Sequence, residues 1–338
     1  MRNDLICNAL LALSDPRLSM RAMPGCDWPA DNWPQLFALA DAHGVLGFVL
    51  HNVDRGIAAG CPGLGPDLPG LVRARQSWRA QLVRTLKLRQ FGQQLLAALA
   101  AADVPAVLLK GMDFADHLYP QPALRPTRDL DLFVPHERWP DAHGVLRQFG
   151  LRVAENQSGR SLTQHYGEQA WRREGGMSVD LHWNFVDKAV QRRRLRTAFG
   201  DWNWALATQG GVTRLQPTPA IRLVIAALHA AVSHQFERLL HLSDLREACR
   251  QVAAASDLQP LRQTLERTRT HAVVAVALAV ARRVLNDDSV AQLSAQLRCG
   301  RAASMATHLI SLPVVLGPRR PARYVRRRLL REFLKFAA

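Results

Sequence analysis

The spacing of apolar residues changes twice along this chain of 338 residues, and that change limits the folds it can adopt. Residues 1–102 and 189–316 carry apolar side chains at helical spacing, including a long helix expected from about residue 71 to residue 101. Between them, residues 103–188 contain the short apolar runs VPAVLLK, DLDLFV and GMSVDLHWNF, separated by helical stretches. The sequence therefore predicts an α+β protein in which helical segments flank a small mixed sheet.

Composition excludes several classes of protein. With 48% hydrophobic residues the chain is expected to be globular and long enough for two cores. Its five cysteines are odd in number and form no CxxC pair, which argues against a disulfide framework or a thiolate zinc site. The apolar run AVVAVALAVA, residues 272–281, is too short to cross a bilayer, and the N-terminus lacks a clear cleavage site. We therefore expect a cytoplasmic protein.

Much of the formal net charge of +16 lies at the C-terminal end. The last residues, RRPARYVRRRLLREFLKFAA, hold eight basic side chains and one acidic one. Apolar side chains recur at helical spacing in this predicted tail, 317–338: Val325, Leu329, Phe333 and Phe336. Such a basic amphipathic helix could contact anionic lipid or RNA. The alternative is a helix docked on its own domain, with its arginines in solvent.

The run RDLDLF, residues 128–133, places two acidic residues in a segment otherwise suited to burial. Side chains alternate along a strand, so Asp129 and Asp131 share one face while the intervening leucines point into the core. Carboxylates about 7 Å apart raise each other's pKa unless a cation lies between them. Mg²⁺ is the expected cation because it prefers oxygen ligands. The alternative is a polar edge strand whose aspartates pair with Arg125 and Arg128.

Two neighbouring segments add groups of the same kind. VLLKGMDF runs from an apolar strand into Lys110 and Gly111 and then a helical stretch, where backbone N–H groups can bind phosphate. Lys110 is one of only four lysines in the chain. Downstream, SVDLHW repeats the strand pattern, with Asp180 and His182 on one face. This strand supplies a third carboxylate.

These motifs resemble the uncharacterised nucleotidyltransferase family of bacterial proteins, within the DNA polymerase β-like nucleotidyltransferase superfamily. The resemblance rests on the KG turn, the RPTRDLDL strand and the VDLHW strand, and HAAVSHQFERLLHLSDL (229–245) is similar to the family's C-terminal part. It implies that residues 103–188 form a nucleotidyltransferase core. It also implies paired metal ligands at Asp129 and Asp131 and a third acidic residue at Asp180.

The resemblance further implies transfer of a nucleotidyl group, expected to be AMP from ATP, to an acceptor hydroxyl. Two Mg²⁺ ions are expected on the three aspartates. The residues expected to hold the nucleoside triphosphate are Lys110, Gly111, Arg125 and Arg128. The acceptor could be a small molecule, a peptide or protein, or an RNA. A different class of function stays open, namely a non-catalytic binding module of the same fold for RNA, a membrane or a protein partner.

Histidines provide further candidates. His182 could orient Asp180 or contact the acceptor, or it could simply be hydrogen-bonded within its strand. In segment 229–245, His234 and His241 lie on one helix face with Asp244 beside them, so two histidines and an aspartate could be metal ligands. Alternatively, this face packs against the core and lines an acceptor pocket, with His234 on the acceptor side.

Overall fold

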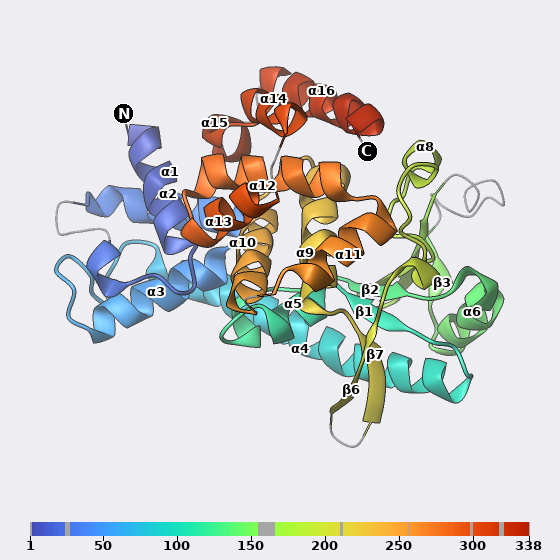
Figure 1. Cartoon of the computed structure of the whole chain (residues 1–338). Coiled ribbons are helices and arrows are strands. Elements are labelled where there is room, and N and C mark those ends of the chain that lie inside the picture. The colour runs from blue at the N-terminus through green and yellow to red at the C-terminus, as the bar shows by residue number, and fades with distance from the viewer. Residues whose placement is uncertain are drawn as a thin grey trace.

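The computed structural model describes residues 2–23, 28–154, 166–209, 212–255, 257–297, 300–317 and 321–337. A five-stranded sheet lies among helices from both ends of the chain, with a two-stranded hairpin projecting from its edge (Figure 1). The predicted α+β architecture with a small mixed sheet is therefore confirmed.

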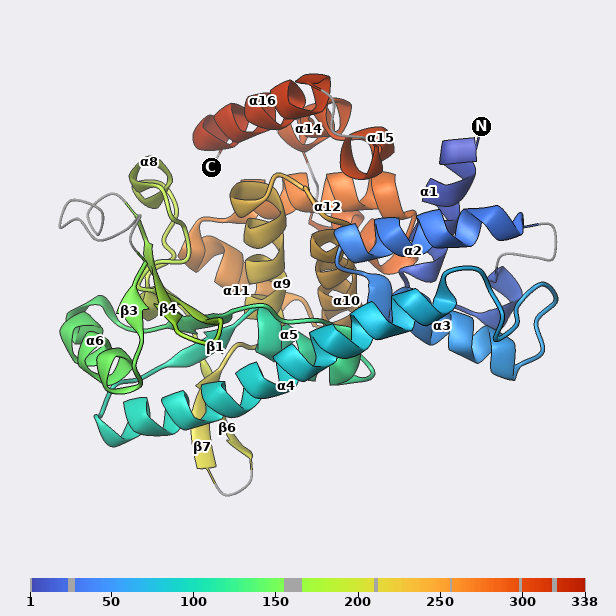
Figure 2. The same ribbon diagram turned by 180° about the vertical axis from the view of Figure 1, so that it is seen from behind.

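In the described part of the chain, the α-helices that precede the sheet are α1 (Arg2–Leu13), α2 (Trp33–Ala42), α3 (Leu46–Ala58) and α4 (Leu71–Ala101). The expected long helix corresponds to α4, which begins after Gly70, whose φ of 80° favours glycine. From the N-terminal helices, α4 runs along the molecule as far as α6 (Trp139–Gln148), as Figure 2 shows. It therefore packs against two different parts of the structure.

The sheet has the strand order β1-β2-β5-β4-β3. Its strands are β1 (Val107–Leu109), β2 (Leu130–Phe133), β3 (Arg152–Val153), β4 (Glu168–Arg173) and β5 (Met177–His182). Strands β2 and β5 are parallel, and the other neighbouring pairs are antiparallel. Helix α5 (Gly111–His117) follows β1 directly. The two strands that carry the predicted aspartates are therefore adjacent at the centre of the sheet.

The two faces of the sheet pack against different helices. Leu130 and Leu132 of β2 join Val179 and Leu181 of β5 in a core with apolar side chains of α4 and α6. The opposite face, which includes Phe133, packs toward the C-terminal helices. Period-two alternation in β2 thus buries the leucines on one side and directs the aspartates to the other, as the sequence predicts.

The remaining elements are mostly helical. They are α8 (Ala189–Arg192), β6 (Ala205–Gln209), β7 (Val212–Gln216), α9 (Pro219–Leu228), the π-helix η7 (His229–Ser233), α10 (Leu239–Ala254), α11 (Gln259–Thr268), α12 (His271–Leu285), α13 (Asp288–Gln296), α14 (Arg301–Leu309), α15 (Leu312–Leu316) and α16 (Pro321–Ala337). Apolar side chains of α1–α3 and of α9–α16 share one continuous core. The division of the sequence at residues 102, 188 and 316 stays a prediction.

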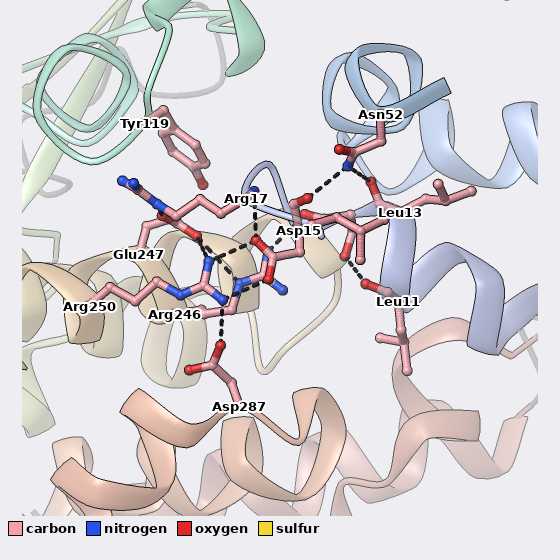
Figure 3. A network of polar contacts seen from close by, with 12 residues as sticks. Leu11, Leu13, Asp15, Arg17, Asn52, Tyr119, Arg246, Glu247, Arg250 and Asp287 are labelled. Atoms are coloured by element: carbon pink, nitrogen blue, oxygen red, sulfur yellow. Dashed lines mark hydrogen bonds and ion pairs between the residues drawn. The ribbon is translucent and has the colours of Figure 1, made fainter. Parts of the chain in front are cut away.

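A polar network joins the N-terminal segment to the C-terminal helices (Figure 3). Arg250 of α10 donates to both carboxylate oxygens of Asp15, at 2.7 and 2.6 Å, and also contacts Asp287. Asn52 of α3 donates to the carbonyl oxygens of Leu13 and Asp15. These contacts fix the end of α1 against α3 and α10.

The basic tail forms α16, which lies on the outside of the molecule with α14 and contacts α12 (Figures 1 and 2). Leu330 and Leu334 are buried, whereas Val325 and Leu329 are about half exposed. Phe333 packs on the core, and the side chain of Phe336 lies outside the described residues. The buried face of α16 therefore includes Leu330 and Leu334, which the sequence analysis did not name, and contact of this helix with lipid or RNA stays a prediction.

No helix among the described residues combines the length and the apolar character needed to cross a bilayer. The described cysteines, Cys7, Cys61 and Cys249, are free thiols, while Cys26 and Cys299 lie outside the described residues.

Candidate active site

Sheet register brings two of the predicted acidic residues together. Asp131 of β2 lies opposite Asp180 of β5, and paired residues on neighbouring parallel strands share a face. Asp129 comes directly before β2, two residues before Asp131, a spacing that places both side chains on the same face. All three line a cleft of about 550 Å³ between the sheet and the C-terminal helices.

The three carboxyl groups differ in their electrostatic surroundings. Burial raises the pKa of Asp129 to about 6, with further contributions from the charges of Asp131 and Asp180. Burial and then the charge of Asp131 also raise the pKa of Asp180. Burial alone would raise the pKa of Asp131 too, but Lys110 and His182 hold it well below its usual range. The cluster therefore contains negative charge that the protein's own cations do not fully compensate, which suits a divalent cation.

Two basic groups meet at one oxygen of Asp131. Lys110 Nζ lies 2.7 Å and His182 Nε2 lies 3.0 Å from Asp131 Oδ1. Burial would lower the pKa values of Lys110 and His182, but nearby carboxylates raise both above their ordinary values. In this structure, Lys110 therefore forms an ion pair with Asp131. His182 is hydrogen-bonded to Asp131 rather than to Asp180, and its contact with the acceptor stays a prediction.

Glu168 is a site residue that the sequence reasoning missed. It lies opposite His182 in the β4–β5 hairpin, and its Oε2 is 3.1 Å from His182 Nδ1. It also lines the cleft. The two glycines at 175 and 176, between EQAWRR and MSVDLH, are a hairpin signal that could have predicted this pairing.

Arg125 has a different partner from those the sequence suggested. Its Nε and Nη2 each donate at 2.8 Å to the carboxylate of Asp244 in α10, and both side chains are buried. Tyr119 donates to the same carboxylate, and Arg125 Nη1 donates to the carbonyl oxygen of Gly111. Arg125 therefore holds the turn and the loop before β2 against α10. Its predicted contact with nucleotide phosphate stays a prediction.

The KG turn is tightly packed. Lys110 has a φ of 47°, and a Cβ atom on Gly111 would come within 2.8 Å of a methyl group of Thr127. Glycine is thus required where the turn passes the loop that leads to Asp129. Binding of phosphate by the backbone of this turn stays a prediction.

Basic side chains outside the aspartate cluster also line the cleft. Arg128 is exposed there and forms no ion pair with any residue in the described ranges. Lys188 and Arg331, the latter from α16, also line the cleft. The basic tail thus contributes a side chain to the site, which the sequence reasoning did not foresee.

A histidine cluster lies on another part of the cleft wall. His229, His234 and His241 bring one possible ligand atom each to within 4.8 Å of one another. Asp244 is not part of this group, because it pairs with Arg125. The suggested set of two histidines and an aspartate is not formed as expected: Asp244 is absent from the cluster, and His229 takes its place beside His234 and His241.

Comparisons with known proteins add to this picture. No curated protein matches the chain. Among solved structures, the crystal structure of ANT(2″)-Ia in complex with adenylyl-2″-tobramycin is similar, with 16% identity, a TM-score of 0.38, and coverage of 54% of this chain and 99% of that one. The solution structure of ANT(2″)-Ia shares 14% identity at the same TM-score, covering 67% of this chain and 97% of that one. A sequence model of uncharacterised nucleotidyltransferases matches residues 29–286, more than half of the chain, and the chain therefore belongs to this nucleotidyltransferase family.

Proposed function

We propose that the cleft transfers a nucleotidyl group, AMP from ATP, to an acceptor hydroxyl. The observation that carries this proposal is the register that sets Asp131 opposite Asp180 on parallel strands, with Asp129 directly before β2. Family membership supports the reaction class. The raised pKa values of Asp129 and Asp180, the latter despite an ion pair with Arg172 at 3.2 Å, support a divalent cation as cofactor.

The three aspartates would hold two Mg²⁺ ions. Lys110 and His182 both contact Oδ1 of Asp131, so its Oδ2 is the oxygen best placed to bind a metal ion. When bound, the metal ions neutralise phosphate charge and lower the pKa of the acceptor hydroxyl. Lys110 and His182 keep the Asp131 carboxylate ionised and fixed in orientation.

The reaction that follows is an in-line displacement. The acceptor oxygen forms a bond to the α-phosphorus as the bond to the β-phosphate oxygen breaks, and pyrophosphate leaves. The hydroxyl proton passes to a carboxylate of the site, which we propose to be Asp180, or to water. Arg128, which lines the cleft, is suited to bind the leaving phosphates, because a guanidinium can donate two parallel hydrogen bonds to phosphate oxygens.

A non-catalytic binding module is the second candidate function. One observation favours it: the ammonium group of Lys110 already supplies a cation beside Asp131. A module of this kind would bind nucleotide or a partner without turnover.

A labelling experiment separates the two functions. The protein is incubated with each α-³²P-labelled nucleoside triphosphate and Mg²⁺, alone and with the small-molecule, protein and RNA fractions of a cell extract. We expect label to move from ATP to a component of one fraction, and we expect the Asp129→Ala variant to transfer none. The matched control is Asp67→Asn, which changes an exposed carboxylate outside the cleft. Metal-dependent nucleotide binding without transfer to any fraction would favour the binding module.

A further inference from the structure

Three imidazole rings from separate positions of the chain converge at the cleft. His229 begins η7, His234 follows that π-helix, and His241 lies in the first turn of α10. The ring centroids are 4.5 Å apart for His229 and His234, 4.7 Å for His229 and His241, and 4.3 Å for His234 and His241. The three rings are therefore direct neighbours of one another.

An unusual backbone brings these residues together. In a regular α-helix, residues five positions apart point about 140° away from each other. Here His234 N–H donates to the carbonyl oxygen of His229, an i→i+5 bond that closes a π-turn. The next residues, Gln235 and Phe236, have φ values of 44° and 58°, which is unfavourable for residues other than glycine. Strained backbone of this kind is characteristic of functional sites, where contacts with the surrounding structure hold it in place.

The packing around Phe236 maintains this conformation. Its ring is fully buried, and its N–H donates to the carbonyl oxygen of Ala230 at 2.7 Å. Arg327 of α16 donates to the carbonyl oxygen of Phe236 at 3.1 Å. The histidines are thus held in place by contacts from their own segment and from the C-terminal helix.

The cluster contains polar atoms that lack partners. Nδ1 of His229 and Nδ1 of His241 are buried and have no hydrogen bond within the described part of the chain. An unsatisfied buried polar atom costs about 1–3 kcal/mol, so two of them in one cluster require an explanation. Burial lowers the pKa of all three rings, that of His234 to about 4, and neutral imidazole is the form that binds metal.

We propose that His229, His234 and His241 bind a transition-metal ion of the Zn²⁺ class, at a site separate from the three aspartates. Imidazole nitrogens suit Zn²⁺, Co²⁺ and Ni²⁺, whereas carboxylates suit Mg²⁺, so the two sites in the cleft select different ions. Tetrahedral Zn²⁺ needs nitrogens about 3.3 Å apart, so the rings, two of which are stacked in this structure, would rotate toward one another on binding. Three protein ligands leave a fourth position, open to the cleft, for water or an oxygen of the acceptor.

This site does not depend on nucleotidyl transfer, so metal binding can test it directly. Metal-stripped full-length protein is titrated with Zn²⁺ by calorimetry and with Co²⁺ by visible absorption, in excess Mg²⁺ to occupy the aspartates. We expect one equivalent of Zn²⁺ to bind and the intense absorption of tetrahedral Co²⁺ to appear. His234→Gln and His241→Gln should each weaken binding at least about tenfold.

The controls distinguish this site from others. His143→Gln changes another poorly exposed histidine with a lowered pKa, which lies on α6 outside the cleft, and it should leave Zn²⁺ binding unchanged. Asp129→Asn should also bind Zn²⁺ normally. The partial exposure of His234 makes its variant the safer test if His241→Gln does not fold, which circular dichroism will show. Absence of Zn²⁺ binding, unchanged binding in folded histidine variants, or equal loss in Asp129→Asn would overturn the proposal.

Discussion

Asp131 and Asp180 lie opposite each other on the parallel strands β2 and β5, so the backbone itself sets the distance between their side chains. Lys110 and His182 balance the charge of Asp131, and Arg172 forms a half-exposed ion pair with Asp180. Burial and the charge of Asp131 nevertheless raise the pKa of Asp180. We therefore expect a divalent cation to stabilise this pair.

The Asp180→Asn variant tests this relationship. It should raise the melting temperature of metal-free protein, because removing one of two facing charges outweighs the loss of the half-exposed ion pair with Arg172. Mg²⁺ should no longer raise the melting temperature further. Nucleotidyl transfer should fall at least about a hundredfold, since metal ligation contributes several kcal/mol. Thermal unfolding in EDTA and in increasing MgCl₂ measures the first effect, with Asp67→Asn as the control. A variant that is less stable without metal, or that keeps its full response to Mg²⁺, would contradict this view.

The buried pair of Arg125 and Asp244 is predicted to stabilise the loop before β2. Asp244→Asn leaves the guanidinium buried without a counter-charge, which should lower the free energy of unfolding by about 3–5 kcal/mol. Arg125→Lys should also destabilise the protein, because an ammonium cannot replace both hydrogen bonds. Urea denaturation measures both. Asp116→Asn, which disrupts a more exposed pair with Arg89, should cost about 1 kcal/mol or less. If Asp244→Asn and Asp116→Asn lowered the free energy of unfolding equally, the pair of Arg125 and Asp244 would not have the stabilising role predicted for it.

Arg128 is predicted to bind nucleotide phosphate without contributing to stability. Arg128→Ala should weaken binding of a non-hydrolysable ATP analogue with Mg²⁺ about 10- to 100-fold, because charged hydrogen bonds contribute about 1.5–3 kcal/mol. Its melting temperature should not change, since the side chain is exposed. Calorimetric titration measures the affinity, and Arg262→Ala on α11 removes an exposed arginine outside the cleft as the control. The same affinity in both variants would rule out this role for Arg128.

The placement of the acidic residues could be predicted because strand alternation is a local property. Leu130 and Leu132 require burial, and this determines where Asp129 and Asp131 point. The resemblance implied that Asp180 joins these two aspartates as a third acidic residue, and the parallel pairing of β2 with β5 brings Asp180 opposite Asp131.

The missed residues depend on contacts that no local pattern encodes. Arg125 could be expected to pair with a carboxylate, but Asp244 lies 119 positions further along the chain. His229 could not be grouped with His234 from helical spacing, since only the π-turn brings them to the same side. In α16, both possible apolar stripes fit helical spacing, and packing against the body of the protein selects Leu330 and Leu334.

Asp15 is predicted to make stability depend on pH in the acid range. Burial would raise its pKa, but the hydrogen bond from Arg250 and the charge of Arg246 hold it at about 2 (Figure 3). A carboxylate with a pKa lower in the folded state stabilises the fold above pH about 4 and loses this effect as pH falls toward 2. Asp15→Asn should therefore cost about 2 kcal/mol at pH 7 and much less near pH 2.5. Urea denaturation at both pH values, beside Asp67→Asn, measures this, and a cost that does not change with pH would contradict it.

Leu329 and Leu330 are adjacent in α16 and offer a matched test of how the basic helix is held. Leu330 is fully buried, so Leu330→Ala should lower the free energy of unfolding by about 2–5 kcal/mol through lost burial and the cavity left behind. Leu329 is 51% exposed, so Leu329→Ala should change it by about 0.5 kcal/mol or less. Urea denaturation of the two full-length variants gives the comparison. Because Arg331 on the same helix lines the cleft, Leu330→Ala should also weaken nucleotide binding, while Leu329→Ala should not. Equal, small effects of both substitutions would mean that the helix detaches from the body of the protein in solution, as a free lipid- or RNA-binding helix would.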